Sequence, residues 1–257
     1  MTVNQMFDIK DKVVVITGGS VGLGSYMAAG FAEAGANLVI AARKVERCVE
    51  LCKDLERYQI KAVPAACDVS NYEDCKRLVD LTIESFGRLD ILVNNAGISW
   101  TADAMDYPMD KWNRVIGVNL TGLFQLSALA ARVMKEQGAG KIINIASVSA
   151  FLGSPPEGQN TVAYNASKGA VITLTKDLAV KWARYGITVN AIAPGYFPTD
   201  LNRKLLERIK DRVLPRIPLG RFGEPDDLRG VVIFLSSPAA NYITGQTIIL
   251  DGGRTCW

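Results

Sequence analysis

Tyr164 and Lys168 lie four residues apart in a helical pattern, and their side chains are suited to acid–base chemistry. On a helix this spacing places a phenol and an ammonium one turn apart on the same face. A free phenol has a pKa of about 10, and a fixed positive charge beside it favours the phenolate and lowers that pKa. The pair therefore predicts a tyrosine that exchanges protons near neutral pH. The same spacing also fits a half-buried ring with a lysine stem packed along it, so the chemical interpretation depends on the other motifs.

A glycine-rich turn near the N-terminus predicts a site for an anion. The apolar run Val13 to Thr17 breaks into glycines at Gly18, Gly22 and Gly24, and a helical pattern begins there. We expect Gly18 to turn the backbone, and Gly22 and Gly24 to let a pyrophosphate approach the first amides of the helix. The spacing is Gly-x-x-x-Gly-x-Gly instead of Gly-x-Gly-x-x-Gly, and a tight connection without a ligand is the alternative.

Three more segments carry polar residues where predicted strands end or inside a predicted helix. They are Asn94-Asn95-Ala96-Gly97 after an apolar run, Val118 to Gly122 around Asn119 in a long helical pattern, and Ser147 after the run 141–145. With the glycine turn, the Tyr164/Lys168 pair and Pro194-Gly195, these motifs resemble those of the short-chain dehydrogenase/reductase family in type and order. The resemblance covers essentially the whole chain.

This resemblance implies an enzyme that interconverts a secondary alcohol and a ketone by hydride transfer with NAD(P)(H). Tyr164 would give or take the proton, and Lys168 would lower its pKa and hold the nicotinamide ribose. Ser147 would hold the substrate oxygen, with Ser149 as a second candidate. Asn119 would anchor a water through its backbone carbonyl, on a path from Lys168 to solvent.

The same resemblance implies a set of cofactor-binding residues. They are Gly18, Ser20, Gly22, Leu23, Gly24, Arg43, Asp68, Val69, Asn95, Ala96, Gly97, Tyr164, Lys168, Pro194, Gly195 and Thr199. An acidic residue at the end of the second strand would accept hydrogen bonds from a ribose 2′-hydroxyl, whereas an arginine attracts a 2′-phosphate. Ala42 holds the usual acidic position and Arg43 follows it, so the sequence favours NADP(H), with NAD(H) possible.

Apolar runs alternate with helical patterns, which predicts an α/β fold with a doubly wound parallel sheet of about seven strands. The predicted strands are 13–17, 38–42, 62–66, 91–94, 141–145, 188–193 and 247–250. The predicted helices are 22–34, 45–58, 72–86, 111–137, 163–185 and 225–235, with Gly35, Gly87, Gly138 and Gly186 as helix stops. We expect one Rossmann-type domain over 1–257.

Two loop segments are expected to shape the substrate pocket. The family resemblance implies that the segment around 196–218, with its charged and apolar stretch 201–216, covers the substrate; an amphipathic surface helix is the alternative. The interval from Ser147 to Tyr164 is four residues longer than is usual in the family. The extra residues fall in the Pro- and Gly-rich stretch 153–160, which we expect to border the pocket.

Composition excludes several other classes of protein. The chain has 257 residues, 49% of them hydrophobic, and a net charge of +3, which implies neither a nucleic acid nor an anionic membrane as partner. It contains no histidine, so His-rich zinc sites and Ser-His-Asp hydrolysis are excluded. The five cysteines lack paired CxxC spacing, and we predict structural roles and no metal. With neither a signal-peptide core nor an apolar run long enough to span a bilayer, the expected location is the cytoplasm.

The substrate is the least determined feature. The pattern resembles the 3-oxoacyl-(acyl carrier protein) reductases most, with gluconate 5-dehydrogenase-like sugar-acid enzymes or cyclic-alcohol dehydrogenases as alternatives. A non-catalytic dinucleotide-binding sensor is the more distant alternative, and the retained Ser147, Tyr164 and Lys168 argue against it. The resemblance and the small-residue-rich stretches 122–131, 163–170 and 245–253 predict a homotetramer.

Overall fold

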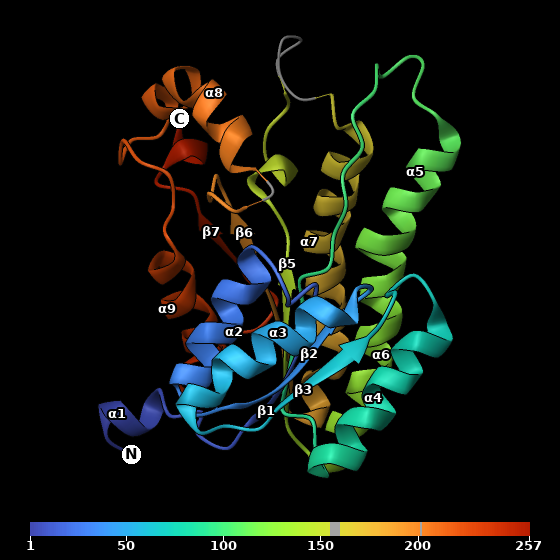
Figure 1. The fold of residues 1–257 in the computed structure, drawn as a ribbon, viewed down its shortest axis with the longest axis vertical. Helices are drawn as coiled ribbons and strands as arrows, with labels where there is room; N and C mark the ends of the chain where they lie inside the picture. The colour runs from blue at the N-terminus through green and yellow to red at the C-terminus, as the bar shows by residue number, and fades with distance from the viewer. Residues whose placement is uncertain (155–159, 201) are drawn as a thin grey trace.

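The chain folds around one parallel sheet. The computed structural model describes residues 1–154, 160–200 and 202–257 (Figure 1). Seven strands lie in the order β3-β2-β1-β4-β5-β6-β7, and each pairs with its neighbours in parallel. Their bounds are β1 Val13–Thr17, β2 Asn37–Ala42, β3 Ala62–Ala66, β4 Ile91–Asn94, β5 Gly140–Ile145, β6 Ile187–Pro194 and β7 Thr247–Leu250. The strands predicted from sequence are confirmed, with bounds that agree to within one residue.

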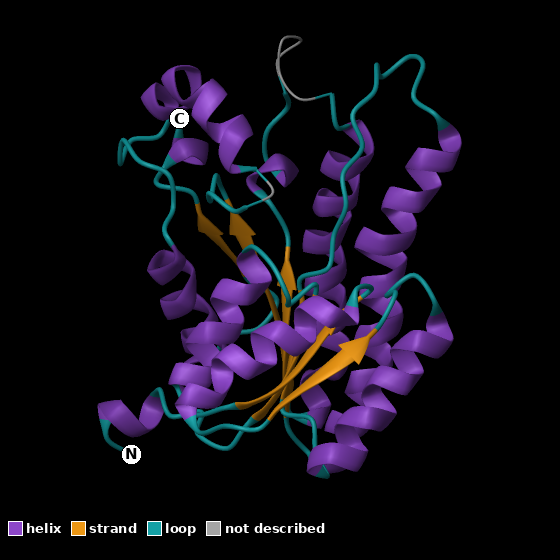
Figure 2. Cartoon of the chain, viewed as in Figure 1, coloured by secondary structure: helices purple, strands orange, loops and turns teal. Residues whose placement is uncertain are grey.

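Helices cover both faces of the sheet (Figure 2). Successive residues of β1 show this division, because Val14 and Ile16 pack into one apolar cluster with α2, α3 and α9, whereas Val15 packs into another with α4, α6 and α7. Such alternation is what parallel strands buried on both faces require. The α-helices are α1 Val3–Met6, α2 Leu23–Glu33, α3 Val45–Leu55, α4 Tyr72–Phe86, α5 Met109–Ile116, α6 Leu123–Gln137, α7 Val162–Trp182, α8 Arg203–Val213 and α9 Pro225–Ser236.

Four glycines end helices as the sequence predicts. Gly87, Gly138 and Gly186 follow α4, α6 and the 3-10 turn after α7, each with a φ of +72°, and Gly35 follows α2 with a φ of +81°. A residue with a Cβ is disfavoured in this left-handed region, so glycine is the natural stop.

The predicted helix 111–137 is longer and less regular than expected. It runs from Met109 to Gln137 as α5, a π-helical turn η2 over Gly117–Gly122, and α6. We expected no apolar run long enough to span a bilayer, but by length and composition alone this helical run could cross a membrane. Its most apolar 18-residue window has a mean hydropathy of 1.2. However, 56% of that window is buried inside the fold, as in the core helix of an α/β protein.

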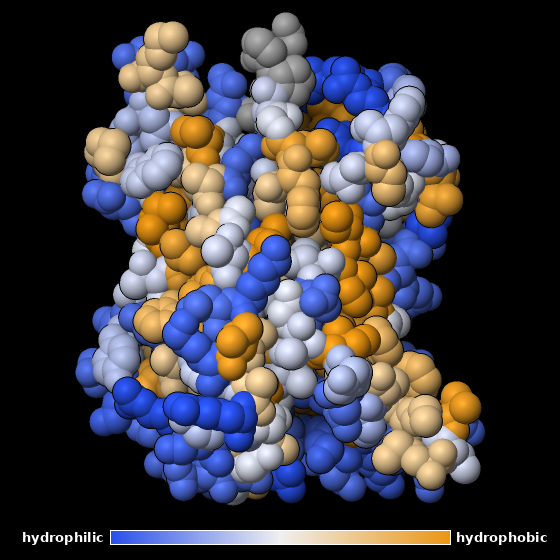
Figure 3. Space-filling model, turned by 180° about the vertical axis from the view of Figure 1, so that it is seen from behind, coloured by the Kyte–Doolittle hydropathy of each residue, from blue (hydrophilic) through white to orange (hydrophobic). Residues whose placement is uncertain are grey.

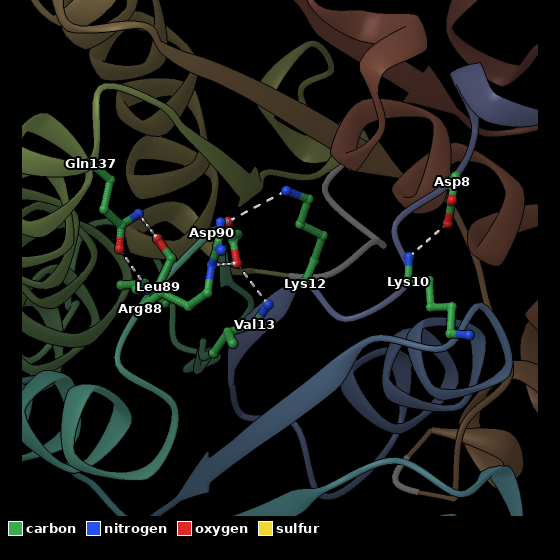
Figure 4. A network of polar contacts seen from close by, with 8 residues as sticks. All are labelled: Asp8, Lys10, Lys12, Val13, Arg88, Leu89, Asp90 and Gln137. Carbon is green, nitrogen blue, oxygen red and sulfur yellow. Dashed lines mark hydrogen bonds and ion pairs between the residues drawn. The ribbon is translucent and has the colours of Figure 1, made fainter. Parts of the chain in front are cut away.

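Polar contacts fasten the edge of the sheet where the strands begin (Figure 4). The Asp90 carboxylate, just before β4, accepts a hydrogen bond from the backbone N–H of Val13 at 2.9 Å and from Arg88 Nε at 2.8 Å. The side-chain amide of Gln137 exchanges two hydrogen bonds with the backbone of Leu89, at 3.0 and 2.9 Å. These contacts hold β1, β4 and the end of α6 together, opposite the edge that carries the candidate site.

Candidate active site

A cavity of about 970 Å³ opens along the carboxyl ends of the strands. The strand order reverses between β1 and β4, and open α/β sheets bind ligands at such a switch point. Most of the residues predicted from sequence line this one cavity: Gly18, Ser20, Gly22, Leu23, Arg43, Asp68, Val69, Asn95, Ala96, Gly97, Ser147, Tyr164, Lys168, Pro194, Gly195 and Thr199. Gly24 and Asn119 are the two that do not.

The first turn and the loop after β4 are joined through Thr17. Its hydroxyl accepts hydrogen bonds from the backbone N–H groups of Asn95 and Ala96, both at 3.1 Å. The Asn95 side-chain amide donates in turn to the carbonyls of Thr17 and Gly18, at 3.0 and 2.9 Å. Both loops are therefore held as one unit at the floor of the cavity.

The glycines of the first turn have different roles. Gly18 and Gly22 both have a φ of +59°, and a Cβ on Gly22 would lie 3.2 Å from Thr199 Cγ2, so a side chain there would fill the gap above the start of α2. A Cβ on Gly24 would lie 2.2 Å from the Gly18 carbonyl oxygen. Gly24 is therefore needed for close packing of α2 against the turn, and it does not line the space where we expected it to admit a pyrophosphate.

Tyr164 and Lys168 lie on the first turns of α7 and face the same cavity. Lys168 is buried, its Nζ lies 5.6 Å from the centroid of the Tyr164 ring, and it donates a hydrogen bond to the Ile145 carbonyl at 2.6 Å. Burial lowers the pKa of Lys168 to about 8. Gly97 lies beside this ammonium, because a Cβ added there would be in ordinary van der Waals contact with Nζ, at 3.6 Å.

The pKa of Tyr164 differs from the sequence-based expectation. Burial raises it, and a hydrogen bond with Ser147 only partly opposes that rise. The physical reason is that burial removes the phenol from water and so disfavours the phenolate by more than the hydrogen bond with Ser147 favours it. The phenol is thus protonated at neutral pH in this state.

Ser147 lies two residues after β5 and caps the 3-10 turn η3 (Val148–Ala150). Its hydroxyl accepts a hydrogen bond from the backbone N–H of Ser149 at 3.1 Å and also interacts with the Tyr164 hydroxyl. Ser149 lines the cavity too, but the contact with Tyr164 belongs to Ser147. The geometry therefore favours Ser147 over Ser149 as the serine of the site.

Asn119 lies behind the cavity wall, fully buried, within the π-turn η2. Its Oδ1 accepts from the Ile98 N–H at 2.8 Å, and its Nδ2 donates to the Ile98 carbonyl at 2.9 Å and to the Ser167 hydroxyl at 3.0 Å. The Ser167 hydroxyl donates to the Tyr164 carbonyl at 2.7 Å. The side chain of Asn119 thus links the loop after β4 to the helix that carries Tyr164 and Lys168.

The opposite end of the cavity, at β2 and β3, is basic. Ala42 ends β2, and three basic residues that follow it line the cavity: Arg43, Lys44 and Arg47. Lys44 and Arg47 were not predicted from the sequence. Burial acts to raise the pKa of Asp68, but hydrogen bonds from Ser70 and the charge of Arg43 outweigh burial, so the pKa is lowered. A carboxylate and an exposed arginine therefore face the same space at this end.

The two loop segments expected to shape the pocket lie beside the cavity where they are described. Leu152, Gly153 and Ser154 line it, whereas 155–159 of the expected insertion lie outside the described residues. The charged stretch 201–216 contains α8 and the 3-10 turn η5 (Leu214–Arg216), with Leu201 outside the description. Several of its side chains line the cavity: Leu205, Leu206, Ile209, Arg212, Val213 and Arg216.

Arg254 is a lining residue that the sequence analysis missed. Its place could have been predicted from the sequence, because it follows Gly252-Gly253 just after the last strand. The carboxyl ends of parallel strands meet at one edge of the sheet, where the site lies.

The cavity fits a nicotinamide dinucleotide. The glycine turn offers helix amides for a pyrophosphate and leaves a gap that a Cβ at Gly22 would fill, and Asp68 and Arg43 lie at the end where an adenosine ribose would bind. Lys168 and Tyr164 lie beyond Gly97, at the other side of the switch point.

Comparisons with known proteins identify the family to which the chain belongs. The family model described as enoyl-(acyl carrier protein) reductase matches residues 18–255. The chain is 38% identical to the 3-oxoacyl-[acyl-carrier-protein] reductase of Thermotoga maritima, over 95% of this chain and 98% of that one. It is 41% identical to the 2-dehydro-3-deoxy-D-gluconate 5-dehydrogenase of Dickeya dadantii, over 96% of each chain.

A solved structure is equally similar. The gluconate 5-dehydrogenase of Burkholderia cenocepacia, in complex with NADP and tartrate, superposes with a TM-score of 0.93 at 40% identity, over 100% of both chains. The fold, the arrangement of Ser147, Tyr164 and Lys168, and these matches agree with the family predicted from the motifs. The chain belongs to the short-chain dehydrogenase/reductase family, whose members are oxidoreductases of alcohol and ketone groups.

Proposed function

We propose that this protein interconverts a ketone and a secondary alcohol with NADP(H), and that Tyr164 transfers the proton. In reduction, ketone, NADPH and one proton give alcohol and NADP⁺. The observation that carries the proposal is the convergence of Ser147, Tyr164 and Lys168 on one cavity beside the glycine turn. The cofactor supplies or accepts the hydride when it is bound.

The residues of the chain provide orientation and a proton. The Tyr164 phenol is protonated at neutral pH, so it can donate to a carbonyl oxygen, and the nearby Ser147 hydroxyl can donate a second hydrogen bond to that oxygen. Lys168 has a pKa of about 8 and is largely charged at neutral pH, which stabilises the phenolate left after donation. Asn119 holds the loop after β4 against α7 through hydrogen bonds to Ile98 and Ser167.

The preference for NADP(H) is supported by charge. Arg43, Lys44 and Arg47 line the cavity where β2 ends, and Ala42 presents no carboxylate to repel a 2′-phosphate. The similar gluconate 5-dehydrogenase was solved with NADP. NAD(H) remains the second candidate.

Two substrate classes are supported by relatives. The sequence motifs favour a 3-oxoacyl substrate, the class named for the Thermotoga maritima reductase. A sugar acid is the second class, because the chain is 41% identical to the Dickeya dadantii 2-dehydro-3-deoxy-D-gluconate 5-dehydrogenase. In either class the segment around 196–218 would cover the substrate, because α8 and η5 border the cavity.

Replacing Tyr164 with Phe tests the proposal. The variant loses one hydroxyl and no packing volume, so kcat should fall on the order of 10²–10⁴-fold while NADPH affinity changes little. Tyr185→Phe, at the far end of α7, is the matched control and should keep full activity. Turnover of a ketone panel is followed by NADPH absorbance; a loss of only a few-fold in Tyr164→Phe would remove the tyrosine from the proton-transfer step.

We further propose a cytoplasmic homotetramer. Hydrophobic side chains gather across the middle of the rear face (Figure 3), and Phe124 on α6, Val180 on α7 and Ile249 on the edge strand β7 are exposed. Burial of such side chains between copies is the usual reason for closed symmetric assemblies. Light scattering at micromolar concentration should give four times the chain mass, and a monomer would refute the proposal.

A further inference from the structure

Arg254 is a lining residue whose guanidinium is only partly satisfied by the protein. It begins the 3-10 turn η7 (Arg254–Cys256) after the last strand and lines the cavity. Its Nε and Nη1 atoms are buried, and neither has a hydrogen-bond partner among residues 1–154, 160–200 and 202–257. Buried polar groups are nearly always paired, and a charged one is costly to leave unpaired. The guanidinium therefore carries a positive charge beside the cavity that the described residues do not compensate, and an anionic ligand there would compensate it.

The backbone holds Arg254 in place without neutralising it. The Asp251 carboxylate accepts hydrogen bonds from the N–H groups of Gly253 and Thr255, at 2.9 and 2.8 Å, so both of its oxygens are used within the turn. This turn packs closely against the Pro194-Gly195 loop, because a Cβ added to Gly195 would lie only 2.9 Å from Asp251 Cα. The Arg254 guanidinium lies 4.9 Å from the centroid of the Tyr196 ring, which fixes it further.

Sheet order separates Arg254 from the end of the cavity where a 2′-phosphate would bind. Arg43 follows β2 and Arg254 follows β7, five strands away in the order β2-β1-β4-β5-β6-β7. Strands are about 4.8 Å apart, so these two positions are on the order of 24 Å apart. Ser147 follows β5, only two strands from β7, or about 10 Å away. Arg254 is therefore far from the Arg43 end of the cavity and close to the reacting groups.

We propose that Arg254 binds a carboxylate of the substrate, which makes the substrate a small oxo acid with its ketone and carboxylate a few carbons apart. The inference rests on the proposed function, because it takes Ser147 and Tyr164 as the position of the reacting carbonyl. A guanidinium matches a carboxylate with two parallel N–H···O bonds. Arg216 of η5 lines the same cavity and adds positive charge near its rim, while Asp68, the carboxylate among the described lining residues, lies at the β3 end.

The test compares a carboxylate ketone with its neutral amide and with two other ketones, using the full-length enzyme with NADPH. The probes are 5-oxohexanoate, its neutral amide 5-oxohexanamide, 5-oxohexyl phosphate and a 3-oxobutanoyl thioester. Wild type should turn over the carboxylate with a kcat/KM about 10–100-fold above that of the amide. Arg254→Gln should lose about that factor on the carboxylate, mostly in KM, and change the amide less than about 3-fold. Arg254→Lys should recover part of the loss, and Arg57→Gln, exposed and outside the cavity, is the control.

The other outcomes separate the inference from the proposed function. If Arg254→Gln lowers kcat/KM equally for the carboxylate and the amide, or lowers neither, the carboxylate site is overturned. It is also overturned if the enzyme prefers the thioester or the phosphate and Arg254→Gln does not change that preference. A preference for the phosphate that Arg254→Gln abolishes would overturn the choice of carboxylate. Calorimetry of 5-oxohexanoate with the NADP⁺ complex is independent of turnover. If wild type binds it and Arg254→Gln does not, the site stands even where absence of turnover refutes the proposed reaction.

Discussion

Asn119 and Ile98 exchange two hydrogen bonds, one at 2.8 Å from the Ile98 N–H to Oδ1 and one at 2.9 Å from Nδ2 to the Ile98 carbonyl. A side-chain amide here stands in for a neighbouring strand and satisfies both polar groups of one backbone unit. It does so from a π-turn, a local irregularity that often occurs at functional sites. The loop beside Lys168 is thereby fixed from behind.

Replacing Asn119 with Ala should therefore loosen the site and destabilise the fold. The backbone groups of Ile98 would lose both partners, and the Ser167 hydroxyl would lose one donor, so the free energy of unfolding should fall by about 2–4 kcal/mol. The Michaelis constant for NADPH should rise several-fold because Gly97 and Ile98 line the cavity. Urea unfolding and steady-state kinetics check both, with Asn113→Ala on the exposed surface of α5 as control. Wild-type values for both quantities would contradict this role.

Lys168→Ala should reduce both turnover and cofactor affinity, because the ammonium faces Tyr164 and lies beside Gly97 at the cavity wall. Loss of the charge removes the group that stabilises a phenolate at Tyr164. Lys176→Ala, exposed two turns further along α7, provides the matched control. Fluorescence titration with NADPH and single-turnover rates measure the two effects separately. Unchanged affinity for NADPH would remove Lys168 from the cofactor site and leave it with the proton transfer only.

Much of this architecture was predictable from the sequence because its causes are local. Runs of Val and Ile bounded by turns give the strands, and Gly87, Gly138 and Gly186 end helices because the left-handed backbone conformation favours glycine. The glycine turn, Asn95 to Gly97, Ser147 and Pro194-Gly195 follow strand ends, so their meeting at one edge was also predictable.

The features that sequence reasoning missed depend on tertiary placement. Arg254 reaches the cavity only because β7 lies beside β6, and Gly24 is needed because α2 packs on the Gly18 carbonyl. The raised pKa of Tyr164 depends on burial, which the spacing of residues along a helix does not specify.

The cofactor preference can be reversed at the end of β2. Arg43 offers a charge-assisted contact worth about 1.5–3 kcal/mol, so wild type should prefer NADPH by about 10–100-fold in kcat/KM. Ala42→Asp should favour NADH, since the new carboxylate repels a 2′-phosphate and accepts from free ribose hydroxyls. Arg43→Gln should reduce the preference without reversing it. Initial rates with NADPH and NADH measure the preference in each variant. A wild-type preference for NADH would mean that Arg43 does not contact the 2′-position of the adenosine ribose.

Lys141 gives a prediction about stability and pH. It lies on β5 beside Thr188 of β6, and its Nζ is buried with no hydrogen-bond partner within the described residues. Burial lowers its pKa from 10.5 to about 8. Because the folded pKa is lower than the unfolded one, the unfolded chain binds more protons between these values. The contribution of Lys141 to stability is therefore fully present above pH 10.5 and is lost as the pH falls through about 8.

Lys141→Met removes the titrating amine and keeps much of the side-chain volume. At pH 7 the variant should be more stable than wild type by about 1–3 kcal/mol, the order expected from a shift of this size, and most of that gain should disappear by pH 10.5. Urea unfolding at pH 7, 9 and 10.5 measures the difference. Lys53→Met, exposed on α3, should show no such dependence. A gain in Lys141→Met that is the same at all three pH values would show that packing, and not the buried charge, stabilises the variant.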